Sequence, residues 1–355
     1  MNNKKICYMI VGLGVGGAEN VVIQLANSFV EDNDITLVLL SNDLALKNKL
    51  HEKVKIIVYD LKNNKSNFLK LLLFLISTDF DIIHAHMYHS NLISRIVKIF
   101  KPSIKIINSI HNTIEIKNKN KCKVVNFLYR ITDFAVNNIT NVSVQASENT
   151  IKNSITNRRK ITTIYNGSDF VNFPLSAVPV VLNDKCEFKI LTVASLTEQK
   201  GIDNAILAVS DLIRHGYNIS YHILGNGSLR PKLLHMIAQL EMEEYIHLHG
   251  VSNNVAGYMN YVDLFLLPSR WEGFGLVLLE AVACDLNIIA TDCDGPVEIL
   301  GKNYVNLCAS DDIQDLSNKI KACYSDNNIY YDKKQIINSF SVLSMIEGYK
   351  QLYVK

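Results

Sequence analysis

The sequence lacks the features that would place it in several common protein classes. Its seven cysteines are odd in number and show no Cys-x-x-Cys spacing, which argues against a disulfide framework or a zinc site and predicts reduced thiols. No apolar run approaches the roughly 20 residues of a membrane-spanning helix, because the longest, residues 71–76, lies between Lys70 and Asp79. We therefore expect a soluble cytoplasmic protein.

Net charge is also small, at +2, but it is unevenly distributed. Residues 1–170 contain 22 Lys and Arg against 13 Asp and Glu (+9), and residues 171–355 carry −7. Basic and apolar residues alternate in segments 98–105 and 117–130. Anionic lipids attract such segments by about 1 kcal/mol per nearby basic residue, and an ordinary solvated face is the alternative. No nucleic-acid-binding motif accompanies this charge, so nucleic acid is not an expected partner.

The chain is long enough for two domains, and apolar strand patterns alternate with helical patterns through both halves. This alternation predicts an α/β protein with two doubly wound parallel sheets facing across a cleft, with ligands outside the carboxyl ends of the strands. The predicted boundaries are a first domain over 1–170, a linker over 171–185, a second domain over 186–334 and a terminal helix over 335–355. One predicted strand of the first domain spans 142–145.

The most specific block follows a predicted strand at 262–267. The strand stops at a proline, Glu272 lies in the turn, and glycines at 273 and 275 let backbone N–H groups approach a ligand. A helix predicted from Leu276 adds unpaired N–H groups and a positive dipole end, which favours an anion. The block predicts an anion-binding strand–turn–helix unit.

Two glutamates flank this unit, and Glu280 lies about one turn inside the helix, where it can accept hydrogen bonds from two adjacent hydroxyls. N–H groups that donate to a phosphate, beside carboxylates that accept from hydroxyls, fit a sugar nucleotide. The alternative interpretation is a helix that merely carries two surface glutamates. The block resembles the Glu-x7-Glu motif of the retaining family 4 glycosyltransferases, which have the GT-B fold. The resemblance implies that Glu272 and nearby amides hold the donor sugar, and that Glu280 binds the ribose. The donor-binding residues of the block are Gly273, Phe274, Gly275, Leu276 and Glu280.

A glycine-rich loop near the N-terminus supports two interpretations. Glycines at 12, 14 and 17 have the Gly-x-Gly-x-x-Gly spacing of dinucleotide-binding domains, and Asp43 would then hold a ribose. The other half of the chain contains no hydride-transfer site, which weighs against a dehydrogenase. The tetrad that begins at Gly16 is similar to the Gly-Gly-Ala-Glu of family 4 transferases, and this implies that the amides of Gly16 and Gly17 approach the donor phosphate and the acceptor.

Histidines follow two predicted strands. His111 comes after the strand at 104–108, where the resembling family has a histidine that contacts the donor sugar, although a core histidine is the ordinary reading. His84, His86 and His89 form a group in which 84 and 86 share a strand face, but no carboxylate or cysteine completes a ligand set. We expect no metal and assign His86 to the acceptor side.

The residues expected to bind the donor phosphate depart from the family pattern. Lys200 is present, but Ser195 stands where the resembling family has arginine. Loss of a hydrogen bond to a charged group, about 1.5–3 kcal/mol, would weaken donor binding roughly ten- to a hundredfold. Val251 lies in a segment that resembles the loop against the base.

The resemblance covers nearly the whole chain and implies a retaining, metal-independent hexosyltransferase with Glu272, His111 and Lys200 as catalytic residues. The donor would be a UDP- or GDP-sugar, with no cofactor. The acceptor would be a saccharide, possibly linked to polyprenyl diphosphate, for surface polysaccharide synthesis at the inner face of the membrane. Two alternatives stay open: a sugar-nucleotide epimerase of the same fold, and a non-catalytic subunit that supports a partner transferase, which the serine at 195 motivates.

Overall fold

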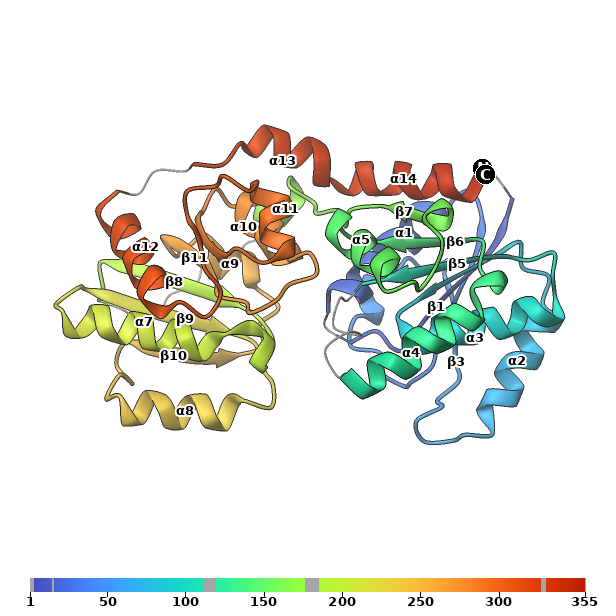
Figure 1. Cartoon of the computed structure of the whole chain (residues 1–355), viewed down its shortest axis with the longest axis horizontal. Coiled ribbons are helices and arrows are strands. Elements are labelled where there is room, and N and C mark those ends of the chain that lie inside the picture. Colours follow the sequence, from blue (N-terminus) through green and yellow to red (C-terminus); the bar gives the residue numbers. More distant parts are fainter. Residues whose placement is uncertain (1–2, 15, 112–118, 176–184, 327–329, 355) are drawn as a thin grey trace. The chain divides into compact units, whose positions relative to one another are not determined.

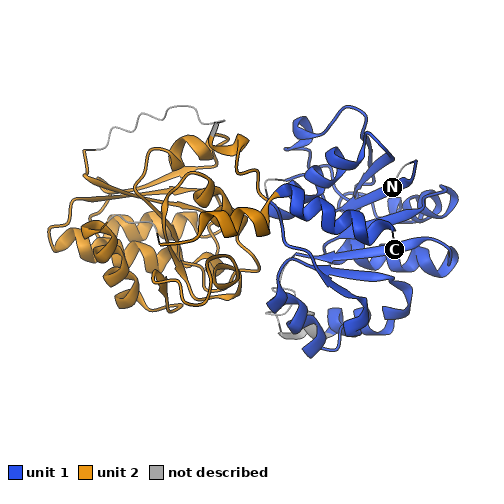
Figure 2. Ribbon diagram, turned by 90° about the horizontal axis from the view of Figure 1, so that it is seen from above, with its two compact units in different colours: residues 1–167, 342–355 blue, residues 168–341 orange. Residues whose placement is uncertain are grey.

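The computed structural model describes residues 3–14, 16–111, 119–175, 185–326 and 330–354. The chain divides into two compact units (Figure 2). Unit 1 contains Met1–Gly167 and the terminal segment Val342–Lys355, and unit 2 contains Ser168–Ser341. The predicted linker falls largely on residues outside the described part.

Unit 1 is built on a seven-stranded sheet in the order β3-β2-β1-β4-β5-β6-β7, and every pairing is parallel. Its strands are β1 (Lys5–Ile10), β2 (Asp34–Leu39), β3 (Lys55–Val58), β4 (Ile82–His86), β5 (Lys105–Ile110), β6 (Asn138–Asn141) and β7 (Ile161–Thr163). Its helices are α1 (Gly17–Phe29), α2 (Asn67–Ser77), α3 (Tyr88–Phe100), α4 (Lys119–Ile131), α5 (Val144–Lys152) and α14 (Val342–Val354), with short 3-10 turns η1 (Lys47–Lys49), η3 (Asp133–Ala135) and η4 (Arg158–Lys160).

The strands at the centre of this sheet are buried on both faces. In β4, Ile83 and Ala85 join the core cluster with side chains of α2 and α3, such as Leu71 and Val97. Because side chains alternate along a strand, His84 and His86 point to the opposite face, where α14 lies against α1. Figure 1 shows α2, α3 and α4 as neighbouring helices in unit 1.

Unit 2 is also built on a parallel sheet, with six strands in the order β10-β9-β8-β11-β12-β13. Its strands are β8 (Phe188–Val193), β9 (Ile219–Leu224), β10 (Ile246–Gly250), β11 (Leu264–Leu267), β12 (Asn287–Thr291) and β13 (Leu307–Cys308). Its helices are α6 (Asn172–Leu175), α7 (Ile202–Arg214), α8 (Arg230–Gln239), α9 (Val255–Met259), α10 (Leu276–Ala283), α11 (Asp294–Leu300), α12 (Ile313–Ser325) and α13 (Lys333–Phe340), and a 3-10 turn η5 spans Glu198–Lys200. The prediction of two doubly wound parallel sheets is therefore confirmed.

Two local findings differ from the sequence expectations. The strand predicted at 142–145 is wrong, because β6 ends at Asn141 and the Ser143 hydroxyl accepts a hydrogen bond from the Ala146 N–H (3.1 Å), which starts α5 instead. In addition, the predicted terminal helix is interrupted at Ser341, where α13 of unit 2 ends and α14 of unit 1 follows.

Both sheets have a point at the centre where the strand order reverses. In unit 1 the chain adds β2 and β3 on one side of β1 and then returns to place β4 on the other side. In unit 2 the corresponding neighbours are β8 and β11. Open α/β sheets bind ligands beyond the carboxyl ends of such a pair of strands, so functional residues are expected in the loops after β1, β4, β8 and β11.

Candidate functional site

In unit 1, the loops after β4 and β5 place two predicted histidines together. His86 is the last residue of β4, and His111 follows β5 directly. The Nδ1 of His86 lies 2.9 Å from the Nε2 of His111, and the two rings stack at 5.2 Å between centroids. His86 is fully buried. Met87, next along the chain, has a φ of +68°; such a conformation is unfavourable for a side-chain-bearing residue and is often found at functional sites.

These histidines are uncharged at neutral pH. Burial holds the pKa of His84 and of His86 well below the usual range, and it lowers the pKa of His111 to about 4. A neutral imidazole has one N–H donor and one acceptor nitrogen. Among the described residues, His86 Nε2 and His111 Nδ1 have no hydrogen-bond partner. The pair therefore has one unused donor and one unused acceptor, both buried, among the described residues.

The glycine loop of unit 1 lies after β1, between Ile10 and α1. A Cβ added at Gly12 would lie 2.6 Å from the Ser41 hydroxyl, and one at Gly14 would lie 2.8 Å from an oxygen of Asp43. These glycines therefore lie close to side chains of the loop after β2, which would have to move to admit a larger residue. Gly16 is the extended residue before α1, and the helix begins at Gly17, so their amides lie at the helix N-terminus, as predicted for a phosphate-binding loop.

In unit 2, the loops after β8 and β11 bring together two residues 72 positions apart in sequence. Lys200 Nζ forms an ion pair with Glu272 Oε2, and the two side chains are only 16% and 11% exposed. The Ser269 hydroxyl also lies 3.5 Å from the same carboxylate oxygen. Ser195, in the loop after β8, is exposed. A cation and a carboxylate that are both partly buried and in contact form the charged centre of this unit.

Arg270, which the sequence analysis did not single out, holds the two loops together. Its guanidinium makes two hydrogen bonds to the Asp203 carboxylate (2.9 and 3.0 Å) and one to Asp311 (2.6 Å), and it donates to the Glu198 carbonyl (2.8 Å). The bonds to Asp203 raise the pKa of the guanidinium further. Arg270 stands two residues before Glu272 in the sequence, but the carboxylates that it binds lie far away along the chain.

The turn before α10 has the geometry that the sequence predicted. Gly275 has a φ of +92°, and α10 starts at Leu276, so the glycine permits the left-handed residue that this turn requires. Gly295 at the start of α11 packs against the Phe274 backbone, and its N–H donates to the Glu272 carbonyl (3.1 Å). Any larger residue at 295 would displace the turn that carries Glu272.

The remaining predicted donor residues also lie near carboxyl ends of unit 2 strands. Glu280 is half-buried in the second turn of α10. Val251 is 59% exposed directly after β10, and the Gly250 carbonyl before it accepts the Gly225 N–H at 2.7 Å. Lys200 and Glu272 therefore meet after the central strands β8 and β11, whereas Val251 follows β10 at the outer edge of the sheet.

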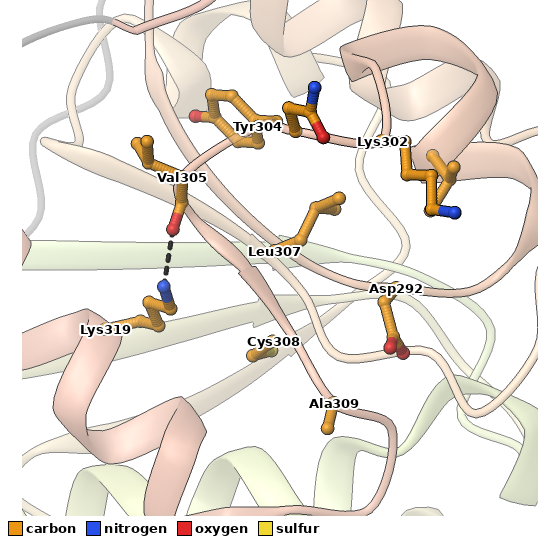
Figure 3. A pocket seen from close by; sticks show the side chains of 10 residues that line it. Asp292, Lys302, Tyr304, Val305, Leu307, Cys308, Ala309 and Lys319 are labelled. Carbon is orange, nitrogen blue, oxygen red and sulfur yellow. Dashed lines mark hydrogen bonds between the residues drawn. The ribbon is translucent and has the colours of Figure 1, made fainter.

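A pocket of about 500 Å³ lies elsewhere in unit 2 (Figure 3). It is lined by residues of the loops and helices around β13: Asp292, Val297, Lys302, Asn303, Tyr304, Val305, Leu307, Cys308, Ala309 and Lys319. Lys319 points to the Val305 carbonyl and donates to it (2.5 Å). None of the predicted site residues lines this pocket, so its volume alone does not make it the functional site.

No group of three or more His, Cys, Asp or Glu side chains among the described residues is arranged to hold a metal ion. Likewise, none of the helices that the structure describes combines the length and the apolar character needed to cross a membrane.

Comparisons with known proteins bear on the family and the fold of the chain. The family model described as Glycosyltransferase Family 4 matches residues 15–170, and the model described as Glycosyl transferases group 1 matches residues 178–339. The 4-alpha-N-acetylgalactosaminyltransferase of Campylobacter jejuni that acts on N-acetylgalactosamine-N,N'-diacetylbacillosaminyl-diphospho-undecaprenol is 26% identical over 331 residues, which cover 86% of this chain and 85% of that protein.

Two further similarities concern a segment and the fold. The amylovoran biosynthesis glycosyltransferase AmsK of Erwinia amylovora is 34% identical over 123 residues, or 32% of this chain and 30% of that protein. The crystal structure of Anabaena HepE in complex with UDP and glucose has a TM-score of 0.84 and 19% identity, and the match covers 99% of this chain and 100% of that one. With one glycosyltransferase model matching each half of a chain that has this two-sheet fold, the chain belongs to the glycosyltransferases with the GT-B fold.

Proposed function

We propose that this protein transfers a sugar, with retention of anomeric configuration, from a UDP- or GDP-sugar to a hydroxyl of a saccharide acceptor. The observation that carries the proposal is the buried contact between Lys200 and Glu272 beside the turn before α10. It joins a cation, a carboxylate and free helix N–H groups, which suit a diphosphate and the hydroxyls of a sugar.

Departure of the nucleoside diphosphate is the demanding step, because negative charge grows on its oxygens. Lys200 and the amides at the start of α10 would stabilise that charge, and stabilisation of charge that develops in the transition state is a large contribution to catalysis. Glu272, released from the lysine when the diphosphate binds, would accept hydrogen bonds from the sugar hydroxyls. Glu280 would bind the ribose and Val251 would lie against the base. Ser195 supplies a neutral hydroxyl in place of an arginine.

Gly16 and Gly17 would offer amides to the donor and the acceptor, and His111 would hydrogen-bond a sugar hydroxyl without introducing charge. His86 would serve the acceptor side. The diphosphate oxygen that leaves the sugar can itself take the proton of the acceptor hydroxyl, so this proposal assigns no separate base. It also requires no metal and no cofactor, since Lys200 supplies the positive charge.

Incubation of the purified protein with UDP-glucose, UDP-galactose, UDP-N-acetylglucosamine, UDP-N-acetylgalactosamine and GDP-mannose tests this proposal. Release of nucleoside diphosphate that depends on a polyprenyl-diphosphate-linked monosaccharide supports a transferase. Consumption of donor with no acceptor present would point instead to an epimerase or hydrolase. Donor binding in a thermal-shift assay without any turnover would support the non-catalytic subunit.

We further propose that the acceptor is lipid-linked and that unit 1 associates with the cytoplasmic surface of an anionic membrane. The relative from Campylobacter jejuni acts on an undecaprenol-linked acceptor. In this chain, α2 exposes Leu69 (64%) and Leu73 (60%), and exposed apolar side chains continue on the neighbouring helices. They are Ile99, Phe100, Val124, Phe127, Ile131 and Phe134.

Lysines accompany these apolar residues. Lys65 and Lys70 are exposed on or beside α2, and no acidic residue occurs between Asp60 and Asp79. Apolar side chains that can enter the interface, flanked by cations that anionic headgroups attract, are the two contributions to binding of a peripheral protein.

Sedimentation with vesicles of phosphatidylcholine alone, or mixed with phosphatidylglycerol, tests this association. We expect binding to the mixed vesicles that falls as salt increases and that the double variant Leu69→Gln/Leu73→Gln removes. Leu343→Gln, at an 80% exposed leucine of α14, is the matched control and should bind like wild type. Equal binding to both kinds of vesicle would refute the proposal.

A further inference from the structure

A network of hydroxyl groups lies next to the His86–His111 pair within unit 1. Tyr8 of β1, His84 of β4 and Ser109 of β5 point to the face of the sheet that α14 covers, as their alternation requires. His84 Nδ1 lies 2.7 Å from the Tyr353 hydroxyl, and His84 Nε2 lies 2.7 Å from the Ser109 hydroxyl. Tyr353 donates to the Tyr8 hydroxyl (3.1 Å). All four side chains are buried.

One arrangement of donors in this network places the single proton of His84 on Nδ1. The hydroxyl proton of Tyr353 is directed to Tyr8, so the Tyr353 oxygen accepts from the Nδ1–H of His84. His84 Nε2 then carries no proton and accepts from Ser109. Burial holds the pKa of His84 well below its usual range, so the ring is neutral and has this single proton. Free histidine favours the opposite tautomer, with the proton on Nε2.

His84 in turn contacts the functional pair. The rings of His84 and His86 lie 4.1 Å apart between centroids at an angle of 38°, and His86 is bonded to His111 at 2.9 Å. Tyr8 also lies against His86, at 6.3 Å between centroids. Because this interior is close-packed, a shift or rotation of His84 displaces His86 and, through it, His111.

The end of α14 is itself anchored to the sheet. Lys105 Nζ donates to the Leu352 carbonyl (2.7 Å), and Lys4 Nζ lies 3.4 Å from the Tyr353 carbonyl. Cations at the last carbonyls of a helix are stabilising. The ring of Tyr353 also packs on Phe29 of α1 at 5.2 Å. The Tyr353 hydroxyl is therefore held at one place relative to β4.

We propose that Tyr353 and Tyr8 are positioning residues for catalysis, which fix the tautomer and the ring orientation of His84 and thereby the geometry of the His86–His111 pair. This gives the last helix of the chain a function in the site of unit 1 that is separate from its contribution to stability. The inference rests on the proposed function of His86 and His111, but its first test does not require enzymatic turnover.

That test is NMR of the full-length protein labelled with ¹⁵N at its histidine rings, with signals assigned by His84→Asn and His86→Asn. In the wild type, His84 should carry its proton on Nδ1. In Tyr8→Phe the Tyr353 hydroxyl loses its acceptor and turns to donate to His84 Nδ1, so the proton of His84 should move to Nε2. An Nε2–H tautomer of His84 in the wild type, or an unchanged tautomer in Tyr8→Phe, would overturn the proposal.

Tyr353→Phe should leave His84 Nδ1 without a partner and shift the signals of His86 and His111. The matched control is Tyr331→Phe in unit 2, which also removes a buried hydroxyl bond, to the Leu286 carbonyl (2.8 Å). It should lower stability without any change in the signals of unit 1. Unchanged His86 and His111 signals in Tyr353→Phe would contradict the proposal even if that variant were less stable.

Kinetics then separate this inference from the proposed function. With the donor identified in the nucleotide-sugar panel, Tyr353→Phe should reduce kcat about tenfold, because small misplacements of site groups are costly. The donor KM should stay within about twofold, since only a step after binding is affected. Altered histidine signals with normal kcat would refute the positioning role. If the wild type lacked turnover with every donor, the proposed function would fail while the tautomer measurement still stood.

Discussion

The two units share one arrangement of strands but carry different chemistry at the central edge of the sheet. In unit 1 the loops after the central strands present neutral imidazoles and glycine amides, and burial keeps the histidines uncharged. In unit 2 the corresponding loops present two ion pairs, one between Lys200 and Glu272 and one between Arg270 and Asp203. Uncharged hydrogen-bonding groups suit hydroxyls, whereas a cation suits a diphosphate. Under the proposed function, the charged groups of unit 2 would bind the sugar nucleotide and the neutral groups of unit 1 would bind sugar hydroxyls.

The largest effect is expected from removal of the cation of unit 2. Lys200→Ala should lower kcat/KM about a hundred- to a thousandfold, because it removes a group that stabilises charge in the transition state. Nucleoside diphosphate release with the preferred donor measures this. Lys333→Ala, which removes a different lysine–carboxylate pair of unit 2 (2.6 Å to Asp285), should keep wild-type activity. Comparable loss in both variants would mean that the effect is structural.

A smaller effect is expected for the neutral pair of unit 1. His111→Ala should lower kcat about ten- to a hundredfold, as one hydrogen bond to a sugar hydroxyl is lost. Its dependence on ionic strength should be the same as that of the wild type, since no charge is removed. The exposed His235→Ala in unit 2 is the control. A His111→Ala enzyme with full activity would remove the functional distinction between the units.

Arg270→Lys should have a smaller effect on activity than either of these two substitutions. Lysine cannot reproduce the two parallel bonds to Asp203, so the free energy of unfolding should fall by about 1–2 kcal/mol and the donor KM should rise a few-fold as the Lys200 loop loosens. Urea unfolding and donor titration measure these changes. Arg158→Lys, which alters an exposed Arg–Glu pair in unit 1, should change neither quantity.

The smallest effect concerns pH. The folded pKa values of His84, His86 and His111 lie below those of the unfolded chain, so the unfolded state binds more protons in this range and stability rises with pH. The contribution is complete above about pH 6.5 and is lost as pH falls toward the folded pKa, about 4 for His111.

Urea unfolding at pH 7.5, 6 and 5 measures this slope. In His111→Asn this slope should be smaller than in the wild type by at most about 1.4 kcal/mol per pH unit, whereas His235→Gln should leave it unchanged. A wild-type free energy of unfolding that did not decrease between pH 6.5 and pH 5 would contradict neutral histidines in the folded protein.

Features of the site were predictable from the sequence where the interacting residues are close together along the chain, and were missed where they are far apart. The unit from the strand at 262–267 to the helix at Leu276 was confirmed closely, because β11, the turn and α10 are encoded by neighbouring proline, glycine and apolar residues. By contrast, Arg270 was missed because its partners Asp203 and Asp311 lie 67 and 41 residues away. The strand expected at 142–145 failed for a local reason, since a serine cap competed with β-branched residues.

The sequence by itself determined the two parallel α/β sheets, the glycine-dependent turns and the glutamate block, since each depends on residues within a few positions of one another. Two contacts emerge only in the folded chain. Lys200 pairs with Glu272 over 72 residues, and Tyr353 hydrogen-bonds His84 over 269 residues. The tertiary structure also decided the charge of the histidines, because the pKa of an imidazole depends on burial by distant parts of the chain. Local conformation can be inferred from neighbouring residues, whereas contact and solvation arise only when the chain is folded.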